Sequence, residues 1–219
     1  LKQQTNYPFE EEVKFVYSGP ESVDFPLYLR VPSWCDNPEV SVNGDAVSIK
    51  ASENLIELNR SWNDGDIVSL SLPMEVRTSR WHEHSLALER GPLVYALPVK
   101  EERRSVPAIE TYGSYEELRP ASPWNYGFDQ DLPENVSDRV SVIKGDHSVA
   151  QPWTPWEAPI KLKLKARRVP GWQLYMDMAG PLPHSPAHSE EPEEEIELIP
   201  YGCTNLRITE FPLLRPELK

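Results

Sequence analysis

Apolar and polar residues alternate with a period of two along much of this chain. The odd-numbered apolar residues from Phe25 to Val31 lie on one side of an extended segment, whereas Tyr28 and Arg30 lie on the other. Because successive side chains of a strand point to opposite faces, this pattern predicts a half-buried β-strand. The same reasoning predicts strands at or near residues 40–42, 47–49, 55–60, 67–72, 86–97, 140–142, 160–166, 196–198 and 206–208.

Short turn sequences separate these strands. Asn43 and Gly44 form the strongest hairpin signal, since both residues tolerate the positive φ angles of a tight primed turn. Gly65 between two aspartates allows a second reversal, and Gly91 with Pro92 predicts a bulge or bend between two strand-like halves. Turns this close leave no room for crossover helices, so antiparallel pairing is expected.

We predict an all-β chain of two packed antiparallel β-sandwich domains of the jelly-roll or immunoglobulin-like kind. The 23 prolines among 219 residues suit short strands and turns and disfavour long helices. The alternation is lost in the charged stretch from Lys100 to Pro107, which places the domains at residues 1–100 and 101–219. The stretch from Ala179 to Glu195 has no apolar period and is predicted to be an exposed, extended or mobile loop.

Composition argues against several classes of partner. Hydrophobic residues make up 39% of the chain, enough for a core. A net charge of -13 argues against nucleic acid, which needs a clustered basic face; the basic run from Lys161 to Arg168 alternates with apolar residues and fits the wet side of a strand. No window approaches the ~20 apolar residues of a membrane span. Because the chain opens on Leu1, we expect a piece of a longer protein. The sequence does not determine the compartment, although a periplasmic or extracellular location is favoured over a cytoplasmic one.

Histidine pairs are weak candidates for a metal site. His82 and His84 would share one side of a strand, where both could approach one metal ion with a third ligand from elsewhere. Histidines beside a strand are more often simply exposed polar residues. His184 and His188 would share a face only on a helix, which the prolines around them forbid. We therefore predict neither a metal site nor a cofactor in this chain.

No catalytic set stands out. Glu10 to Glu12 and Glu190 to Glu195 are charge runs, which are normally solvated, whereas a glycosidase needs two carboxylates at a defined separation. Cys35 and Cys203 are too few for a structural zinc site, and nothing in the sequence brings them together as a disulfide. No nucleophile elbow, phosphate loop or Ser, His, Asp set appears. We assign no catalytic residue.

Aromatic residues are the candidates for carbohydrate binding, because aromatic rings stack on the apolar faces of sugars. Burial in a core or an interface is the more frequent role of such residues, so both interpretations stay open. Trp34 and Trp62 border predicted strands and are assigned to the core. The candidate sugar-binding residues are Trp124, Tyr126, Trp153, Trp156 and Trp172.

An ordered set of short motifs extends over nearly the whole chain. Its members are Leu29-Arg-Val-Pro-Ser-Trp34, Val42-Asn-Gly44, Arg60-Ser-Trp62 with Gly65-Asp66, Arg90-Gly-Pro-Leu-Val-Tyr95, Ser122-Pro-Trp-Asn-Tyr126, and Pro200-Tyr-Gly-Cys-Thr204 with Leu206-Arg-Ile208. Any one motif is weak, but the ordered set is specific. Together the motifs resemble the C-terminal β-sandwich region of glycoside hydrolase family 127 (GH127), the β-L-arabinofuranosidase family.

The resemblance implies that an (α/α)6 barrel precedes these sandwiches and holds the active site. There a cysteine would act as nucleophile, and a zinc ion would be bound by three cysteines and a glutamate. None of these residues maps onto this sequence, because Cys35 and Cys203 belong to the sandwich segments and two cysteines cannot supply three ligands. Zinc would therefore belong to the catalytic domain that is missing here.

The sequence thus predicts a non-catalytic C-terminal β-sandwich region of a glycoside hydrolase. Its expected partner is the catalytic barrel of the same chain, and a homo-oligomer and a bound glycan are further partners left open. The alternative is a carbohydrate-binding module for plant polysaccharide. A free-standing interaction sandwich is the third hypothesis. The sequence does not fix the sugar, because accessory domains do not determine the specificity of a pocket they do not contain.

Overall fold

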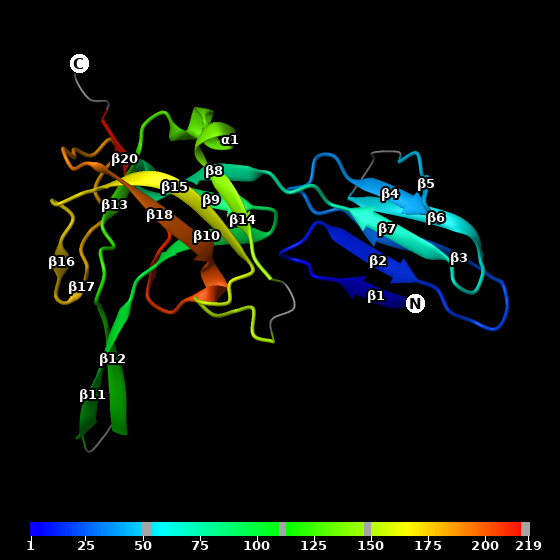
Figure 1. Cartoon of the computed structure of the whole chain (residues 1–219), viewed down its shortest axis with the longest axis horizontal. Coiled ribbons are helices and arrows are strands. Elements are labelled where there is room, and N and C mark those ends of the chain that lie inside the picture. The colour runs from blue at the N-terminus through cyan, green and yellow to red at the C-terminus, as the bar shows by residue number, and fades with distance from the viewer. Residues whose placement is uncertain (50–53, 110–112, 147–149, 216–219) are drawn as a thin grey trace. The chain divides into compact units, whose positions relative to one another are not determined.

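The computed structural model describes residues 1–49, 54–109, 113–146 and 150–215, and there the chain is all-β, as predicted (Figure 1). It divides into two compact units, Leu1–Glu75 and Val76–Lys219. Within the described residues, none of the helices has the length and apolar character that crossing a membrane requires.

The first unit is a β-sandwich of two facing sheets. A five-stranded antiparallel sheet has the order β1-β2-β7-β4-β5, and β3 pairs with β6 in a two-stranded sheet. Side chains from both sheets share one core, in which Trp62 is fully buried and its indole N–H donates to the Phe25 carbonyl at 2.9 Å. The strands are β1 (Lys2–Thr5), β2 (Glu12–Val16), β3 (Val23–Arg30), β4 (Glu39–Val42), β5 (Asp45–Ala46), β6 (Leu55–Trp62) and β7 (Ile67–Ser71).

Positive φ angles occur where the turn residues predicted them. Asn43 and Gly44 have φ of 54° and 90° and join β4 to β5, which confirms the predicted hairpin. Gly65, at φ 86°, lies in the connection between β6 and β7. The returning strand β5 ends at Ala46, so residues 47–49, which the alternation predicted to be a strand, lie beyond its end.

The second unit is built on a nine-stranded sheet of order β20-β13-β15-β18-β10-β9-β8, with β14 added beside β15 and β19 beside β10. Its pairs are antiparallel except β13 with β20. The elements are β8 (Val76–Arg80), η1 (His82–His84), β9 (Leu86–Arg90), β10 (Leu93–Pro98), β11 (Glu101–Ile109), β12 (Gly113–Pro120), β13 (Tyr126–Asp129), η2 (Leu132–Glu134), α1 (Val136–Arg139), β14 (Ser141–Lys144), β15 (Ile160–Arg168), β16 (Leu174–Tyr175), β17 (Met178–Ala179), β18 (Glu193–Pro200), η3 (Tyr201–Cys203), β19 (Arg207–Ile208) and β20 (Leu213–Leu214).

The observed division between the units lies before the predicted boundary at residue 100. β10 pairs with β9 and also with β18, so residues 76–98 are part of the sheet of the second unit. The charged stretch that marked the predicted boundary is β11, which pairs with β12 in a separate hairpin. The described side chains of this hairpin are exposed or half-buried, so a buried face does not impose alternation there.

The charge runs of the second unit form one face of a strand pair. Along β15 the even positions from Ile160 to Ala166 are buried, and the lysines between them face solvent, as predicted. Lys161, Lys163 and Lys165 pair with Glu197, Glu195 and Glu193 across β18, at 3.0, 2.7 and 3.0 Å. The glutamates at the end of the predicted 179–195 loop therefore belong to a strand.

Candidate functional site

The aromatic residues predicted to bind sugar separate into a buried and an exposed group. Trp124, Tyr126 and Trp172 are buried, whereas Trp153 and Trp156 are 45% and 76% exposed. The rings of Trp124 and Trp172 meet edge to face at 5.0 Å inside a core cluster, and the Trp172 indole N–H donates to a carbonyl at 2.9 Å. Trp124 and Trp172 therefore stabilise the second unit and present no open face for a sugar.

Tyr126 is also occupied by structural contacts. Its hydroxyl donates to the Glu194 carboxylate at 2.7 Å, and the Arg168 guanidinium lies 5.4 Å from the ring centre. Burial, with the neighbouring Glu194 carboxylate, raises the pKa of Tyr126 to about 12. The residue joins β13 to the sheet and is not a binding platform. The alternation of residue types did not predict the burial of Tyr126, because the motif Ser122 to Tyr126 lies in a segment without alternation.

Cys35 and Cys203 are both buried, and no disulfide joins them. The Cys203 thiol donates to the Pro152 carbonyl at 3.4 Å, and burial raises its pKa to about 11. A thiol in this state is protonated at neutral pH and lacks the thiolate that nucleophilic attack requires. Two buried cysteines do not fit the three-cysteine zinc site that the resemblance implies. Within the part of the chain that the structure describes, no group of three His, Cys, Asp or Glu residues is arranged to hold a metal ion.

A histidine cluster forms around Glu83. His82 and His84 lie in the tight turn η1, not on a strand, and Glu83 and His84 both have φ of 55°. His184 Nδ1 lies 2.7 Å from the Glu83 carboxylate, and His82 Nε2 lies 3.4 Å from its other oxygen. The hydrogen bond to His184 lowers the pKa of Glu83. These contacts join η1 to the segment around residue 184.

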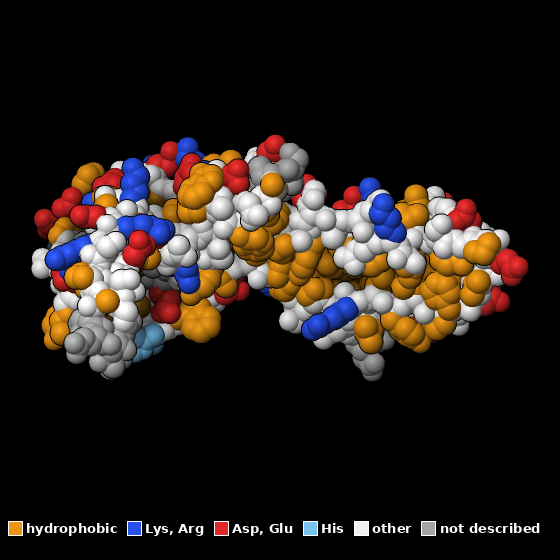
Figure 2. Space-filling view, turned by 90° about the horizontal axis from the view of Figure 1, so that it is seen from below, with side chains coloured by type: hydrophobic (Ala, Val, Ile, Leu, Met, Phe, Trp, Pro, Cys, Tyr) orange, Lys and Arg blue, Asp and Glu red, His pale blue; other side chains and the backbone are white. Residues whose placement is uncertain are grey.

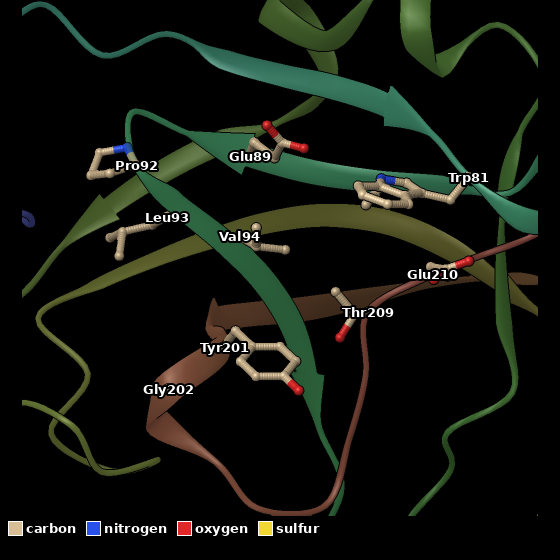
Figure 3. Close-up of a pocket in the computed structure, with 10 residues that line it drawn as sticks. Trp81, Glu89, Pro92, Leu93, Val94, Tyr201, Gly202, Thr209 and Glu210 are labelled. Atoms are coloured by element: carbon tan, nitrogen blue, oxygen red, sulfur yellow. The ribbon is translucent and has the colours of Figure 1, made fainter. Parts of the chain in front are cut away.

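An open hollow of about 620 Å³ lies on the second unit, next to this turn. Figure 3 shows Trp81 on one side of the hollow and Tyr201 on the other, with Val94, Thr209 and Glu210 between them. Trp81 follows β8, Tyr201 begins η3 and Val94 lies on β10. The pairing of β10 with both β9 and β18 brings these distant segments together.

Two sets of hydrogen bonds fix the side chains that line the hollow. The Trp81 indole N–H donates to Ser79 Oγ at 2.8 Å, and that hydroxyl donates to the Glu89 carboxylate at 2.5 Å. On the other side, Ser85 Oγ donates to the Glu210 carboxylate at 2.9 Å. Both carboxylates therefore have defined orientations.

Tyr201 is held from one side of its ring. The Arg207 guanidinium carbon lies 3.5 Å from the ring centre, a close cation–π contact, and the ring remains 45% exposed. The Trp153 ring lies against Gly202, where an added Cβ would come within 3.0 Å of it. Of the residues predicted to bind sugar, Trp153 thus contacts one residue of the hollow, Gly202, but does not line the hollow itself.

Sequence reasoning did not select Trp81 and Tyr201 as site residues. Trp81 precedes the two histidines His82 and His84, and Tyr201 is part of the motif Pro200 to Thr204, but neither pattern indicated a binding role. Their positions beside turns at strand ends were a usable signal, because exposed aromatic residues at such places often take part in binding. Their proximity, however, depends on long-range strand pairing.

Comparisons with known proteins confirm the resemblance. Residues 1–74 match the family model described as "Beta-L-arabinofuranosidase, GH127 middle domain". A GH127 β-L-arabinofuranosidase from Geobacillus stearothermophilus T6 has a similar fold, with 23% identity, a TM-score of 0.59 and 96% of this chain covered. A protein titled "Glycoside hydrolase" (24% identity, TM-score 0.58, 97% covered) and a GH127 β-arabinofuranosidase (18%, 0.61, 96%) are also similar.

The matched part is a minor share of those proteins. This chain covers 30%, 32% and 31% of their lengths, respectively. A search of curated proteins found no match. The chain therefore has the fold of the β-rich part of a larger GH127-like protein.

Proposed function

We propose that this chain is the non-catalytic β region of a larger glycoside hydrolase and that it supports a helical catalytic barrel of the same polypeptide. The extent of the structural likeness carries this proposal. Nearly the whole chain, 96%, superposes on only 30% of a GH127 β-L-arabinofuranosidase. The remaining length of such a protein is ample for the (α/α)6 barrel that the resemblance implies.

The state of the reactive side chains supports a structural role. Cys203 is buried with a raised pKa. Glu193 and Glu195 of the acidic run, and Glu197 beyond it, are paired with lysines across β15 and β18. Glu194, from the same run, accepts a hydrogen bond from the Tyr126 hydroxyl. These groups stabilise strands and a core, which makes them unsuited to act as a nucleophile or an acid–base pair.

An open apolar surface on the first unit supports a packing role. Hydrophobic side chains gather over this unit in Figure 2. On the same unit, a hollow of about 540 Å³ is lined by Phe15, Leu27, Tyr28 and Trp34, and Tyr28 is 55% exposed. Contiguous apolar surface of this kind commonly marks contacts between domains or proteins.

Hydrolysis assays test the proposal. We expect the purified chain to show no turnover of an aryl β-L-arabinofuranoside above the buffer rate, because the buried Cys203 thiol is protonated at neutral pH and no activated nucleophile occurs among the described residues. A GH127 β-L-arabinofuranosidase serves as the positive control in the same assay. Turnover that a thiol reagent abolishes, and that Cys35→Ser or Cys203→Ser removes, would contradict the proposal.

Carbohydrate binding is the second candidate function, and the exposed aromatic residues of the second unit favour it. Trp81 and Tyr201 are 57% and 45% exposed. A carbohydrate-binding role is compatible with the supporting role, because it would hold a glycan near the barrel without performing chemistry. Affinity electrophoresis on an arabinan-rich glycan measures it directly, since a binder migrates more slowly and a pure scaffold does not.

A further inference from the structure

We infer that the hollow between Trp81 and Tyr201 is a binding site for a neutral oligosaccharide. The inference rests on the carbohydrate-binding candidate function and is independent of the supporting role. It assigns the binding to residues other than the five that the sequence suggested.

The two aromatic rings form fixed walls at opposite sides of the hollow (Figure 3). Trp81 is 57% exposed although its indole N–H is bonded to Ser79 Oγ, so the ring is held in place with a large area open to solvent. Tyr201 is held by Arg207 and is also partly open. Rings that are immobile before binding lose little entropy when a ligand stacks on them.

Polar groups of the hollow match the hydroxyl groups of a sugar. Among the described residues, Ser79 and Ser85 are the hydrogen-bond partners of the Glu89 and Glu210 side chains, and each serine bonds one oxygen of its carboxylate. The second oxygen of each carboxylate is thus available to accept a bond from a ligand hydroxyl. The Thr209 side chain also lines the hollow. A sugar has both an apolar face, which can stack on the aromatic rings, and hydroxyl groups, which can bond to the carboxylates. It therefore matches both kinds of group in the lining.

The charge of the hollow favours neutral over acidic sugars. Glu89 and Glu210 form no ion pair with any other residue that the structure describes. The whole chain carries a net charge of -13. A uronate carboxylate would therefore be repelled, whereas a neutral pentose or hexose would not.

The same two carboxylates argue against a protein partner at this place. The centres of protein interfaces are depleted of glutamate, because burying a charge without a partner is costly. An oligosaccharide covers such a shallow site only in part and donates hydrogen bonds to each carboxylate. The volume of about 620 Å³ is within the range of about 300–1,000 Å³ that small-ligand sites occupy.

Titration calorimetry of the 219-residue chain tests the inference with two probes, the neutral trisaccharide α-1,5-L-arabinotriose and the acidic trisaccharide trigalacturonate. We expect arabinotriose to bind, and trigalacturonate to bind at least about tenfold more weakly. Trp81→Ala should weaken arabinotriose binding by about tenfold or more, as loss of a central aromatic contact does in other sites. Trp81→Phe should retain most of the affinity, because it keeps an aromatic face.

Trp156→Ala is the matched control, since it removes another exposed tryptophan of the same unit. It should leave the affinity unchanged. Tyr201→Ala provides a second variant if Trp81→Ala fails to fold, and thermal unfolding reports that failure. Glu89→Gln and Glu210→Gln should each strengthen trigalacturonate binding severalfold.

The outcomes separate the inference from the function on which it rests. If neither probe binds the chain, carbohydrate binding and the inference are both wrong. If binding is lost in Trp156→Ala and kept in Trp81→Ala, the chain binds carbohydrate at another place and the inference alone is wrong. A preference for trigalacturonate would also overturn the assignment of a neutral ligand.

Discussion

Asn43 and Asp66 lie 23 positions apart, yet they form one hydrogen-bonded unit. Asn43 Nδ2 donates to Asp66 Oδ1, and the Ile67 amide donates to Asn43 Oδ1, both at 2.8 Å. Asp66 Oδ2 accepts from the Asn63 amide at 2.8 Å. The motifs Val42-Asn-Gly44 and Gly65-Asp66 therefore owe their residue types to the structure of two adjoining turns, not to chemistry on a substrate.

We expect the contribution of the Asp66 carboxylate to folding stability to depend on pH. The hydrogen bond from the Asn63 amide, and then that from Asn43, lower its pKa from the ordinary 3.8. A lowered pKa in the folded state contributes stability above the unfolded value, and this contribution is lost as the pH falls through the folded pKa. Asp66→Asn should therefore lower Tm near neutral pH, and the Tm difference from the native chain should shrink below about pH 4.

Asp45→Asn is the control for this measurement. It removes an exposed carboxylate of the neighbouring hairpin that has no hydrogen-bond or ion-pair partner among the described residues. Its Tm difference should be small at every pH. A Tm difference for Asp66→Asn that stays constant down to about pH 2.5 would show that the carboxylate does not act as its contacts indicate.

At the scale of elements, the parallel pairing of β13 with β20 depends on a close approach at Gly127. A Cβ there would lie 2.7 Å from Leu214 Cδ2 and 2.8 Å from the Pro212 carbonyl oxygen. The backbone oxygen cannot move without displacing β20, whose register places Phe128 across from Leu213. The absence of a side chain at this glycine lets the C-terminal strand join the sheet.

Gly127→Ala should destabilise the second unit by about 1–3 kcal/mol, as overpacking does in other cores. Gly171→Ala is the matched control, because an added Cβ there meets no atom within 4 Å. Its unfolding free energy should be unchanged or rise by up to about 1 kcal/mol, because alanine lowers the conformational entropy of the unfolded chain. Denaturant titration followed by circular dichroism measures both. Equal effects of the two substitutions would refute the role given to Gly127.

For the whole molecule, the structure places the division at Glu75, and fragments test it. β10 lies inside the sheet between β9 and β18, and Leu86, Leu88 and Tyr95 are fully buried. A fragment of residues 76–219 should therefore unfold cooperatively, whereas residues 101–219 lack three strands of the sheet and should not. Near-ultraviolet circular dichroism and thermal unfolding distinguish these results. A cooperative transition in the shorter fragment would favour the boundary near residue 100.

The alternation of residue types determined by itself that the chain is all-β and where most strands lie. Strand faces such as that of β3, and the Asn43-Gly44 turn, depend on local steric and solvation effects that short segments carry with them. The motifs, in their order, also determined the resemblance to GH127 that the comparisons confirmed. Hairpin β11–β12 escaped prediction because none of its described side chains is buried, so no buried face imposes a period.

Only the tertiary structure decided which aromatic residues are open to a ligand. Trp124 and Trp172 are covered because they meet in a core. Trp81 and Tyr201 line one hollow because β10 pairs with both β9 and β18, two strands that lie more than 100 residues apart in the chain. A sequence pattern specifies the side of a strand on which a residue lies. It does not specify what packs on that side, because that depends on the register of distant strands.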